Sequence, residues 1–344
     1  MLTQADGLPN LERISQLVDQ LAALKQDGKE VILVSSGAVA AGRSLIQISE
    51  KQNTIAARQL LASIGQIKLI NLYQQLFEKH GLLCSQVLVT KEDFRDRMHY
   101  LNIRNCIEIL LQHGVIPVIN ENDVVSVTEL MFTDNDELAG LIASMLNADA
   151  LIILSNVDGI YDGDPKLPSS TVIPEIDGAE TGLSGFITAG KSGLGRGGMV
   201  TKLHTARSVA KLGIPVMIAN GMREHIITDL LYGTVVHTRF KAGKVKSGKK
   251  KWIAHGEGTA KGIVQLNAGA KEALLSGKAS SLLPVGITSI QADFKKGDII
   301  KLIDEQEQLI GLGVAEYGAE QARNCIGEQK QRPLIHYNYF HPLL

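Results

Sequence analysis

The stretch Val115-Ile116-Pro117-Val118-Ile119-Asn120-Glu121-Asn122-Asp123 decides the fold class of this chain. Its first five residues are apolar without alternation, which is typical of a strand buried on both faces of a parallel sheet. The four residues that follow are polar. Ligands of such sheets bind beyond the carboxyl ends of the strands, so we expect Asn120, Asn122 and Asp123 at a ligand site. A turn needs only one or two residues of this kind, so four in a row favour a functional role.

A second polar cluster, Asp134-Asn135-Asp136, lies just before an apolar helix predicted over residues 138–146. Its side chains could contact the same ligand. An aspartate in this place is also a common helix N-cap, and for Asp134 that alternative stays open.

A second buried-type strand, Val31-Ile32-Leu33-Val34, leads into Ser35-Ser36-Gly37-Ala38 and a helix. The hydroxyl of Ser36 and the backbone N–H of Gly37 could bind an anion. Alternatively, these small residues only allow the strand to pack tightly against the helix.

A glycine-rich stretch, Ser192-Gly193-Leu194-Gly195-Arg196-Gly197-Gly198-Met199-Val200-Thr201-Lys202, opens another predicted helix. Glycines allow close approach of the backbone, and the helix start and a lysine favour negative charge, so the stretch predicts a phosphate site. An ordinary glycine-rich surface loop is the alternative. The spacing matches neither G-x-x-x-x-G-K-[ST] nor G-x-G-x-x-G, so it indicates neither a P-loop nor a dinucleotide fold.

Helical and strand patterns alternate along the first two thirds of the chain. A helix with an apolar stripe runs from Leu11, after Asn10 as its cap, until Gly28, and a longer one covers residues 55–77. Strands are expected near residues 87–89, 151–154 and 215–218, with helices between them. The alternation predicts an α/β fold, a three-layer α/β/α sandwich with a mainly parallel sheet.

Composition changes at residues 239–251, which hold seven Lys or Arg and no acid. We expect an α/β domain over 1–238, a basic linker over 239–254, a small β-barrel-like domain over 255–330 and a tail over 331–344. A solvated linker is the usual explanation of such a basic run, and an anion or RNA patch is the alternative. Few aromatic residues are present after residue 255, so the residues themselves do not support RNA binding.

The composition is that of an ordinary globular protein. The chain has 344 residues, 44% of them hydrophobic, and a formal net charge of −1, which predicts no general attraction to nucleic acid. The three cysteines, Cys84, Cys106 and Cys325, are widely spaced among apolar residues and predict buried, reduced thiols. No apolar run has a membrane-spanning length, so we expect a cytoplasmic protein without membrane contact.

Taken together, the segments 34–42, 118–123, 134–136 and 192–202 resemble the amino-acid kinase family, in particular its members that act on glutamate and carry a C-terminal PUA domain. The resemblance runs from Leu2 to about Gly327. It implies transfer of the ATP γ-phosphoryl group to the side-chain carboxylate of L-glutamate, the first step of proline biosynthesis, with ATP and Mg²⁺. It also implies the three-layer domain and the PUA domain.

The resemblance also implies roles for individual residues. Ser36, Asp123 and Asn135 would bind glutamate, and Lys202 would stabilise charge on the phosphates. Asp136 would organise two lysines, Lys202 and the second lysine of the family, which this sequence lacks. The expected ATP contacts, of which Asn156 is less certain because the family more often has aspartate there, are Ser155, Asn156, Arg196, Gly197, Gly198, Met199, Val200, Thr201 and Lys202. No His or Cys cluster predicts a protein-held metal.

Further expectations follow from the same resemblance. They are feedback inhibition by L-proline, a homo-oligomer and association with glutamyl phosphate reductase. Two alternatives stay open: another carboxylate kinase, acting on acetylglutamate or aspartate, and a catalytically weak RNA-binding or regulatory protein.

The start of the sequence departs from the family pattern. The family opens with a strand that leads into a lysine and a Gly-Ser/Thr-Ser loop, whereas this sequence begins Met1-Leu2-Thr3. We therefore expect an earlier native start, and a poor kinase if the chain works as written, because removing one such stabilising group commonly costs about 100–1000-fold in rate.

Overall fold

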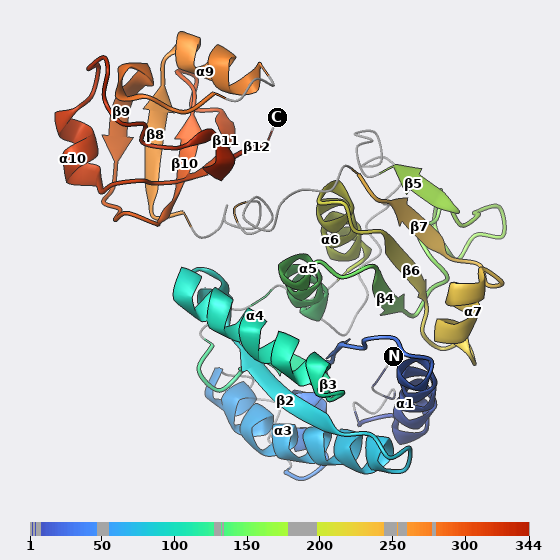
Figure 1. The fold of residues 1–344 in the computed structure, drawn as a ribbon. Helices are drawn as coiled ribbons and strands as arrows, with labels where there is room; N and C mark the ends of the chain where they lie inside the picture. The colour runs from blue at the N-terminus through green and yellow to red at the C-terminus, as the bar shows by residue number, and fades with distance from the viewer. Residues whose placement is uncertain are drawn as a thin grey trace. The chain divides into compact units, whose positions relative to one another are not determined.

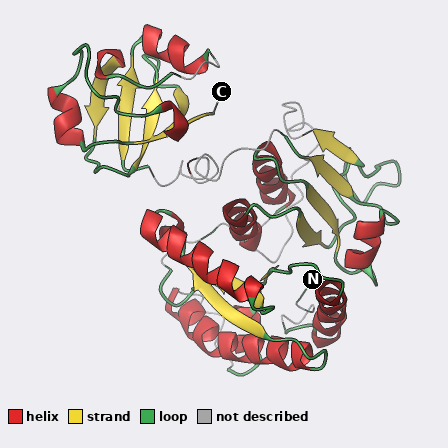
Figure 2. Cartoon of the chain, in the orientation of Figure 1, coloured by secondary structure: helices red, strands yellow, loops and turns green. Residues whose placement is uncertain are grey.

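The computed structural model describes residues 2, 4, 8–46, 55–126, 132, 134–177, 198–243, 253, 260–276 and 280–343. The chain forms two compact units, Met1–Val245 and Lys246–Leu344, which are described separately (Figure 1). Helices flank the sheets of the first unit, whereas a sheet of five strands dominates the second (Figure 2).

The first sheet of the first unit is parallel and has the order β1-β3-β2. These strands are β1 (Leu33–Val34), β3 (Ile116–Glu121) and β2 (Cys84–Val89). All six residues of β3 are buried, as its unbroken apolar run predicts for a central strand. Helices α3 (Ile55–Glu78) and α4 (Arg97–Gln112) lie on opposite sides of this sheet (Figure 1).

The second sheet has the order β4-β6-β7-β5, in which only β6 and β7 run antiparallel to each other. Its strands are β4 (Leu151–Ser155), β6 (Val216–Asn220), β7 (Thr238–Lys241) and β5 (Glu175–Asp177). Helix α6 (Met199–Lys211) packs with Leu151 and Ile153. The alternate residues Ile152 and Leu154 pack with α7 (Ile226–Tyr232) on the other face. The predicted α/β layers and mainly parallel pairing are confirmed, although the described strands are divided over two sheets.

Helix α1 (Leu11–Gln26) packs against the cores of both sheets. Asn10 caps it by accepting a hydrogen bond from the backbone N–H of Arg13 at 3.1 Å, as its sequence predicts. Ile14 and Val18 belong to the core of the first sheet, whereas Leu17 belongs to that of the second. One amphipathic helix therefore contributes to two apolar clusters.

Helix α3 packs against the short helix α2 (Ala38–Arg43), with one glycine from each helix at the contact. A Cβ atom on Gly65 would lie 1.8 Å from the carbonyl oxygen of Ala38, and one on Gly42 would lie 2.1 Å from that of Leu61. No side chain larger than hydrogen fits at either position, so the two backbones are in direct contact. This contact fixes α3 relative to the segment that follows β1.

The second unit is a mixed five-stranded sheet of order β12-β11-β10-β8-β9. Its elements are β8 (Gly262–Leu266), α9 (Ala268–Leu275), β9 (Ile287–Gln291), β10 (Ile299–Ile303), β11 (Leu309–Val314), α10 (Ala319–Asn324) and β12 (Phe340–Pro342). Residues 331–343, expected as a tail, belong to this unit instead, because β12 pairs with β11 and Leu334 and Ile335 are fully buried.

The expected start of the linker, at residue 239, is wrong, because residues 238–241 form strand β7. The alternation in Thr238-Arg239-Phe240-Lys241 is that of a strand, with Thr238 and Phe240 fully buried and the two basic residues exposed. The first unit thus continues through Lys241, beyond the expected boundary at residue 238.

Two general expectations have partial outcomes. The three cysteines are free, but Cys106 is exposed on α4 rather than buried, and Cys84 and Cys325 are half-buried. Among the helices that the structure describes, none combines the length and apolar character that a membrane crossing requires.

We predict that Gly65→Ala destabilises the first unit by roughly 1–3 kcal/mol or more, because the added methyl group overlaps backbone atoms of α2 that cannot rotate away. Urea unfolding measures the loss. Gly269→Ala, in α9, is the matched control, since the nearest atom to its Cβ would be a side-chain oxygen at 3.7 Å. Equal stabilities of the Gly65→Ala variant and the parent would contradict the contact.

Candidate functional site

The three strands of the first sheet end at one edge, where the polar segments of the sequence lie. The backbone N–H of Ser35 donates to the carbonyl of Ile119 at 3.0 Å, and that of Asn122 donates to the carbonyl of Val89 at 2.8 Å. The loops after β1, β2 and β3 are therefore neighbours, as the parallel pairing predicts.

The two serines after β1 have different environments. Ser35 is buried, and its hydroxyl shares a 2.6 Å hydrogen bond with Tyr73 of α3. Burial raises the pKa of Tyr73 to about 12, so this pair is neutral and structural. Ser36 is exposed and precedes Gly37, whose φ of 112° begins α2 in a conformation that favours glycine. Ser36 is thus the serine that a ligand can reach.

Asp123 lies in a pocket of about 220 Å³ between α2, α3, β2 and β3. Its carboxylate is 9% exposed and accepts two hydrogen bonds from the guanidinium of Arg58, from Nη2 at 2.7 Å and from Nε at 3.1 Å. Sequence reasoning found Asp123 but missed Arg58, which lies 65 residues earlier on α3. Ser36 and Asn135 are not among the residues that line this pocket.

Asn120 connects three elements at the floor of the site. Its amide nitrogen donates to Gln66 of α3 at 3.0 Å, and its amide oxygen accepts from Asn135 at 3.2 Å and from the backbone of Glu121 at 2.9 Å. The structure therefore joins Asn135, at the start of α5 (Asn135–Leu146), to the end of β3. Sequence reasoning placed Asn120 at the site but did not foresee Gln66.

Asp134 is the N-cap of α5, so the alternative that its sequence left open is correct. One carboxylate oxygen accepts from the backbone of Asp136 and Glu137 at 3.1 Å each. The other accepts from the hydroxyl of Thr201 on α6 at 2.6 Å. The cap thus also ties α5 to α6.

Asp136 and Lys202 form an ion pair of 2.5 Å between α5 and α6, with both side chains 18% exposed. Burial raises the pKa of Asp136, although the adjacent Lys202 ammonium opposes the shift. One turn further along, Gly140 allows the helices to approach, since a Cβ there would lie 2.8 Å from the side chain of Thr205. The close helix contact places the carboxylate beside the ammonium.

Glu121, the last residue of β3, is a buried carboxylate. It is 6% exposed, and burial raises its pKa, opposed by a hydrogen bond from the backbone of Phe132 at 3.0 Å. The charge of Asp123 raises this pKa further, whereas Arg58 lowers it. Glu121 therefore holds the segment that follows it.

The second half of the candidate site lies at the ends of β4 and β6. Ser155 is buried, Asn156 is exposed, and Ser155 is the register partner of Asn220. Beyond them, Asp158 accepts hydrogen bonds from Asn220 at 3.1 Å and from Arg223 at 2.8 Å, and the Arg223 bond lowers the pKa of Asp158. Sequence reasoning missed this cluster, which orders the loops beside Ser155 and Asn156.

The glycine-rich stretch is described only from Gly198 onward. Gly198 is the N-cap of α6, and its carbonyl oxygen lies 2.8 Å from the hydroxyl oxygen of Thr201. Of the residues expected to contact ATP, Met199, Val200 and Lys202 lie in the first turn and a half of α6, together with Thr201. Arg196 and Gly197 lie outside the described residues.

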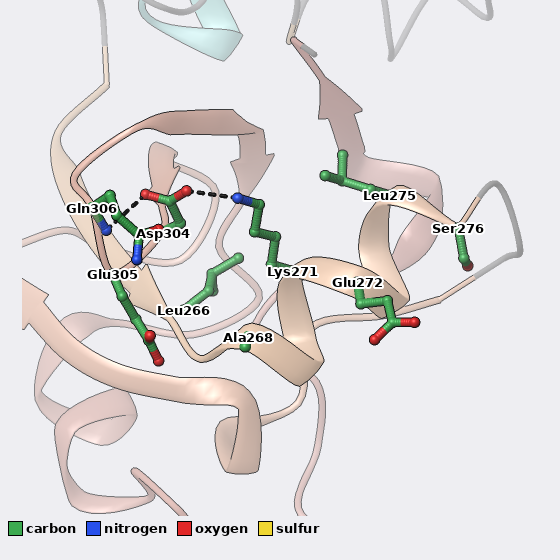
Figure 3. A pocket seen from close by; sticks show the side chains of 9 residues that line it. All are labelled: Leu266, Ala268, Lys271, Glu272, Leu275, Ser276, Asp304, Glu305 and Gln306. Atoms are coloured by element: carbon green, nitrogen blue, oxygen red, sulfur yellow. Dashed lines mark hydrogen bonds and ion pairs between the residues drawn. The ribbon is translucent and has the colours of Figure 1, made fainter.

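A larger pocket, of about 530 Å³, lies within the second unit between α9 and the turn after β10 (Figure 3). Lys271 points toward Asp304 and bonds it at 2.7 Å, and Asp304 also accepts from the backbone of Gln306 and Gln308. These polar groups bond each other and fix the turn. The convergent polar side chains that could bind a ligand are in the first unit.

Metal ligands do not gather at either place. In the part of the chain that the structure describes, no three His, Cys, Asp or Glu side chains are grouped so that they could hold a metal ion. The carboxylates of Asp123 and Asp136 are engaged by Arg58 and Lys202 instead.

Comparison with known proteins identifies the class. Residues 2–220 match the Amino acid kinase family, and residues 262–336 match the PUA domain. The chain belongs to the amino acid kinase family and carries a PUA domain after the kinase domain.

The chain is also similar over nearly its full length to individual proteins of this family that are named Glutamate 5-kinase. The chain is 51% identical to a Glutamate 5-kinase of Bacteroides thetaiotaomicron, over 99% of this chain and 95% of that protein. It is 49% identical to one of Chlorobaculum tepidum, over 99% and 94%. A Glutamate 5-kinase of Thermoanaerobacter sp. is 38% identical over 98% and 92%.

We predict that Glu121→Gln gains stability relative to the parent as pH rises. In the parent, the raised pKa means that the folded state keeps its proton above the ordinary glutamate value, so stability falls as pH rises through that window. Glutamine can still accept from Phe132 but has no proton to release. Urea unfolding from pH 4 to 8 tests this, with Glu108→Gln on α4 as the exposed control. A constant difference between variant and parent at all pH values would contradict it.

Proposed function

We propose that the chain catalyses ATP-dependent phosphorylation of the side-chain carboxylate of L-glutamate, forming L-glutamyl 5-phosphate, the first step of proline biosynthesis. The observation that carries this proposal is the first turn of α5. There, Asn135 donates a hydrogen bond to Asn120, at the end of β3 beside the Asp123 pocket. Its neighbour Asp136 forms an ion pair with Lys202 of α6, the helix that follows the glycine-rich stretch. The relatives named Glutamate 5-kinase support the same activity.

The reaction makes a specific demand on the site. A carboxylate is ionised at neutral pH, so it attacks the γ-phosphorus without a general base, and ADP leaves. The difficulty is that nucleophile and phosphate repel each other, so the site must align them and offset the negative charge. The Asp123 pocket can align the substrate through its ammonium group, and Lys202, at a separate place, can offset the charge of the phosphates.

Asp123, Asn135 and Ser36 are the proposed glutamate contacts. Asp123 suits the α-ammonium, because it is a buried carboxylate at the pocket wall. The amide of Asn135 and the exposed hydroxyl of Ser36 suit the carboxylates, since both groups donate hydrogen bonds. The side-chain carboxylate of the substrate would then face the α5 turn.

Lys202 is the proposed charge-stabilising residue, and Asp136 positions it. The ion pair holds the ammonium at the start of α6, where the helix dipole also favours phosphate. The further ATP contacts proposed are Ser155 and Asn156 after β4 and the backbone from Arg196 to Thr201.

Mg²⁺ fits this site as an ion held by the nucleotide and water. The carboxylates that could ligate it from the protein are already paired with Arg58 and Lys202, so the phosphates would supply its oxygens. Its charge would offset that of the phosphates during transfer.

Regulation and assembly belong to the same proposal. L-Proline, as the product of the pathway, would compete at the glutamate pocket. A homo-oligomer and a partnership with glutamyl phosphate reductase in the cytoplasm are also proposed. RNA binding is not proposed, because the pocket of the second unit carries three carboxylates, from Glu272, Asp304 and Glu305, and one lysine.

We predict that Asp123→Asn raises the KM for glutamate far more than that for ATP. The loss corresponds to about 2–5 kcal/mol, since it removes one partner of a buried charge pair. Steady-state kinetics with the hydroxamate assay for glutamyl phosphate measures both constants. Equal losses for the two substrates would indicate damage to folding, and a parent chain that prefers N-acetylglutamate would overturn the assignment of Asp123.

A second prediction concerns the second unit. A chain that ends after Val245 keeps glutamate-dependent ATP turnover, because every proposed contact lies in the first unit. A chain that ends after Arg239 unfolds, because it loses Phe240, which is fully buried in the core of the second sheet. Circular dichroism and ADP release compare the two. A folded chain that ends after Val245 without turnover would show that the second unit completes the site.

A further inference from the structure

Arg58 stands out because the proposed function leaves its charge without a role. It lies in the first turns of α3, its side chain is 29% exposed, and its guanidinium reaches the Asp123 carboxylate. An arginine beside a substrate-binding aspartate competes with the ammonium group of the substrate, unless the arginine and the ammonium bond different oxygens of the carboxylate. The atoms involved therefore decide what Arg58 does.

Both guanidinium donors bond the same oxygen. Nε and Nη2 contact Oδ1 of Asp123 at 3.1 and 2.7 Å, and no other described residue bonds Oδ2. A carboxylate has two oxygens, so one stays available for a second cation. This geometry allows the aspartate to bind Arg58 and an ammonium group at once.

The helix that carries Arg58 is fixed against the rest of the site. Its Gly65 lies in backbone contact with α2, as described above, and its Gln66 bonds Asn120 at 3.0 Å. Gln59 donates to the carbonyl of Val124, next to Asp123, at 2.7 Å. Arg58 is therefore one of three α3 side chains that fix the end of β3 and the segment that follows it.

The charge of Arg58 is also needed by its surroundings. Asp123 and Glu121 are both buried carboxylates, and the substrate would add two more negative charges next to them. Arg58 is bonded to Asp123, and its charge also lowers the pKa of Glu121. Without it, the carboxylate that should bind the ammonium would lose the two hydrogen bonds that fix its orientation.

We propose, on the basis of the function proposed above, that Arg58 is the positioning residue of the glutamate site. It holds Oδ1 of Asp123 and presents Oδ2 to the α-ammonium of the substrate. Arg58 itself does not touch the reacting atoms. Through Asp123 it sets the selection of an α-amino dicarboxylate over a dicarboxylate without the amino group.

The test uses Arg58→Gln and Arg58→Lys in the full chain, with Arg104→Gln as the matched control. Arg104 is an arginine of α4 whose partner, Glu108, lies on the same exposed helix face. We expect Arg58→Gln to raise the KM for glutamate about 10–100-fold, the range for loss of a charge-assisted hydrogen bond. The KM for ATP and kcat should stay within about twofold. Arg58→Lys should recover part of the loss, and Arg104→Gln should match the parent.

The selection between substrates gives a readout that a structural role would not produce. We expect the ratio of kcat/KM for glutamate to that for glutarate to fall in Arg58→Gln, because only the ammonium contact is misaligned. Glutamate should also raise the unfolding temperature of this variant less than that of the parent. This measurement reports glutamate binding even if turnover is too slow to measure.

Three results separate the possible failures. An unchanged glutamate KM and an unchanged glutamate-to-glutarate ratio in Arg58→Gln would overturn the inference while leaving the proposed function intact. An equal loss for glutamate, glutarate and ATP would also overturn it and assign Arg58 to folding. A parent chain that neither phosphorylates glutamate nor is stabilised by it would overturn the proposed function itself.

Discussion

The site depends on the first turn of α5, where three successive side chains bond three different partners. Asp134 caps its own helix and accepts from Thr201, Asn135 donates to Asn120, and Asp136 pairs with Lys202. Successive residues in a helix point about 100° apart, so one turn can reach the first sheet and α6 at the same time. The polar end of β3 and the first turns of α6, a helix that packs on the second sheet, are thereby joined through one short piece of backbone. A shift of α5 would move the pocket and the lysine together, which is why these contacts matter more than any single residue of either half.

Charge balance is the second constraint on this region. Four carboxylates lie within two short segments, and each has a separate source of compensation in the described structure. Asp123 has Arg58, Asp136 has Lys202, Asp134 has the amides at a helix start, and Glu121 has the amide of Phe132. Buried charges without such partners would be neutralised by protonation. Cations therefore compensate Asp123 and Asp136, whereas backbone amides compensate Asp134 and Glu121, so each of the four acids has a bonding partner.

Sequence patterns predicted the parts of this architecture that depend on local physics. The unbroken apolar runs of β3, β4 and β6 and the capped amphipathic helix α1 are explained by residues within each element, and the polar residues at the strand ends indicate where the candidate site lies. The contacts that depend on tertiary packing could not be predicted. Arg58 meets Asp123 only because Gly65 lets α3 rest on α2, and nothing within either segment shows that contact. Two segments carry a usable signal in the sequence. Thr238-Arg239-Phe240-Lys241 alternates as a strand, although its basic residues also suit a linker. Likewise, Leu334 and Ile335 are an apolar pair within the expected tail.

The two ion pairs of the site share one principle. Asp136 takes one donor of the Lys202 ammonium, which has three, and Arg58 takes one oxygen of the Asp123 carboxylate, which has two. Each pair fixes a charged group in place while leaving part of its bonding capacity for a ligand. An unpaired lysine or aspartate in the same position would pay a larger desolvation cost and sample more rotamers before a substrate arrives. Pairing therefore lowers the cost of holding both charges in place, and each paired group keeps a donor or an acceptor that its partner does not use.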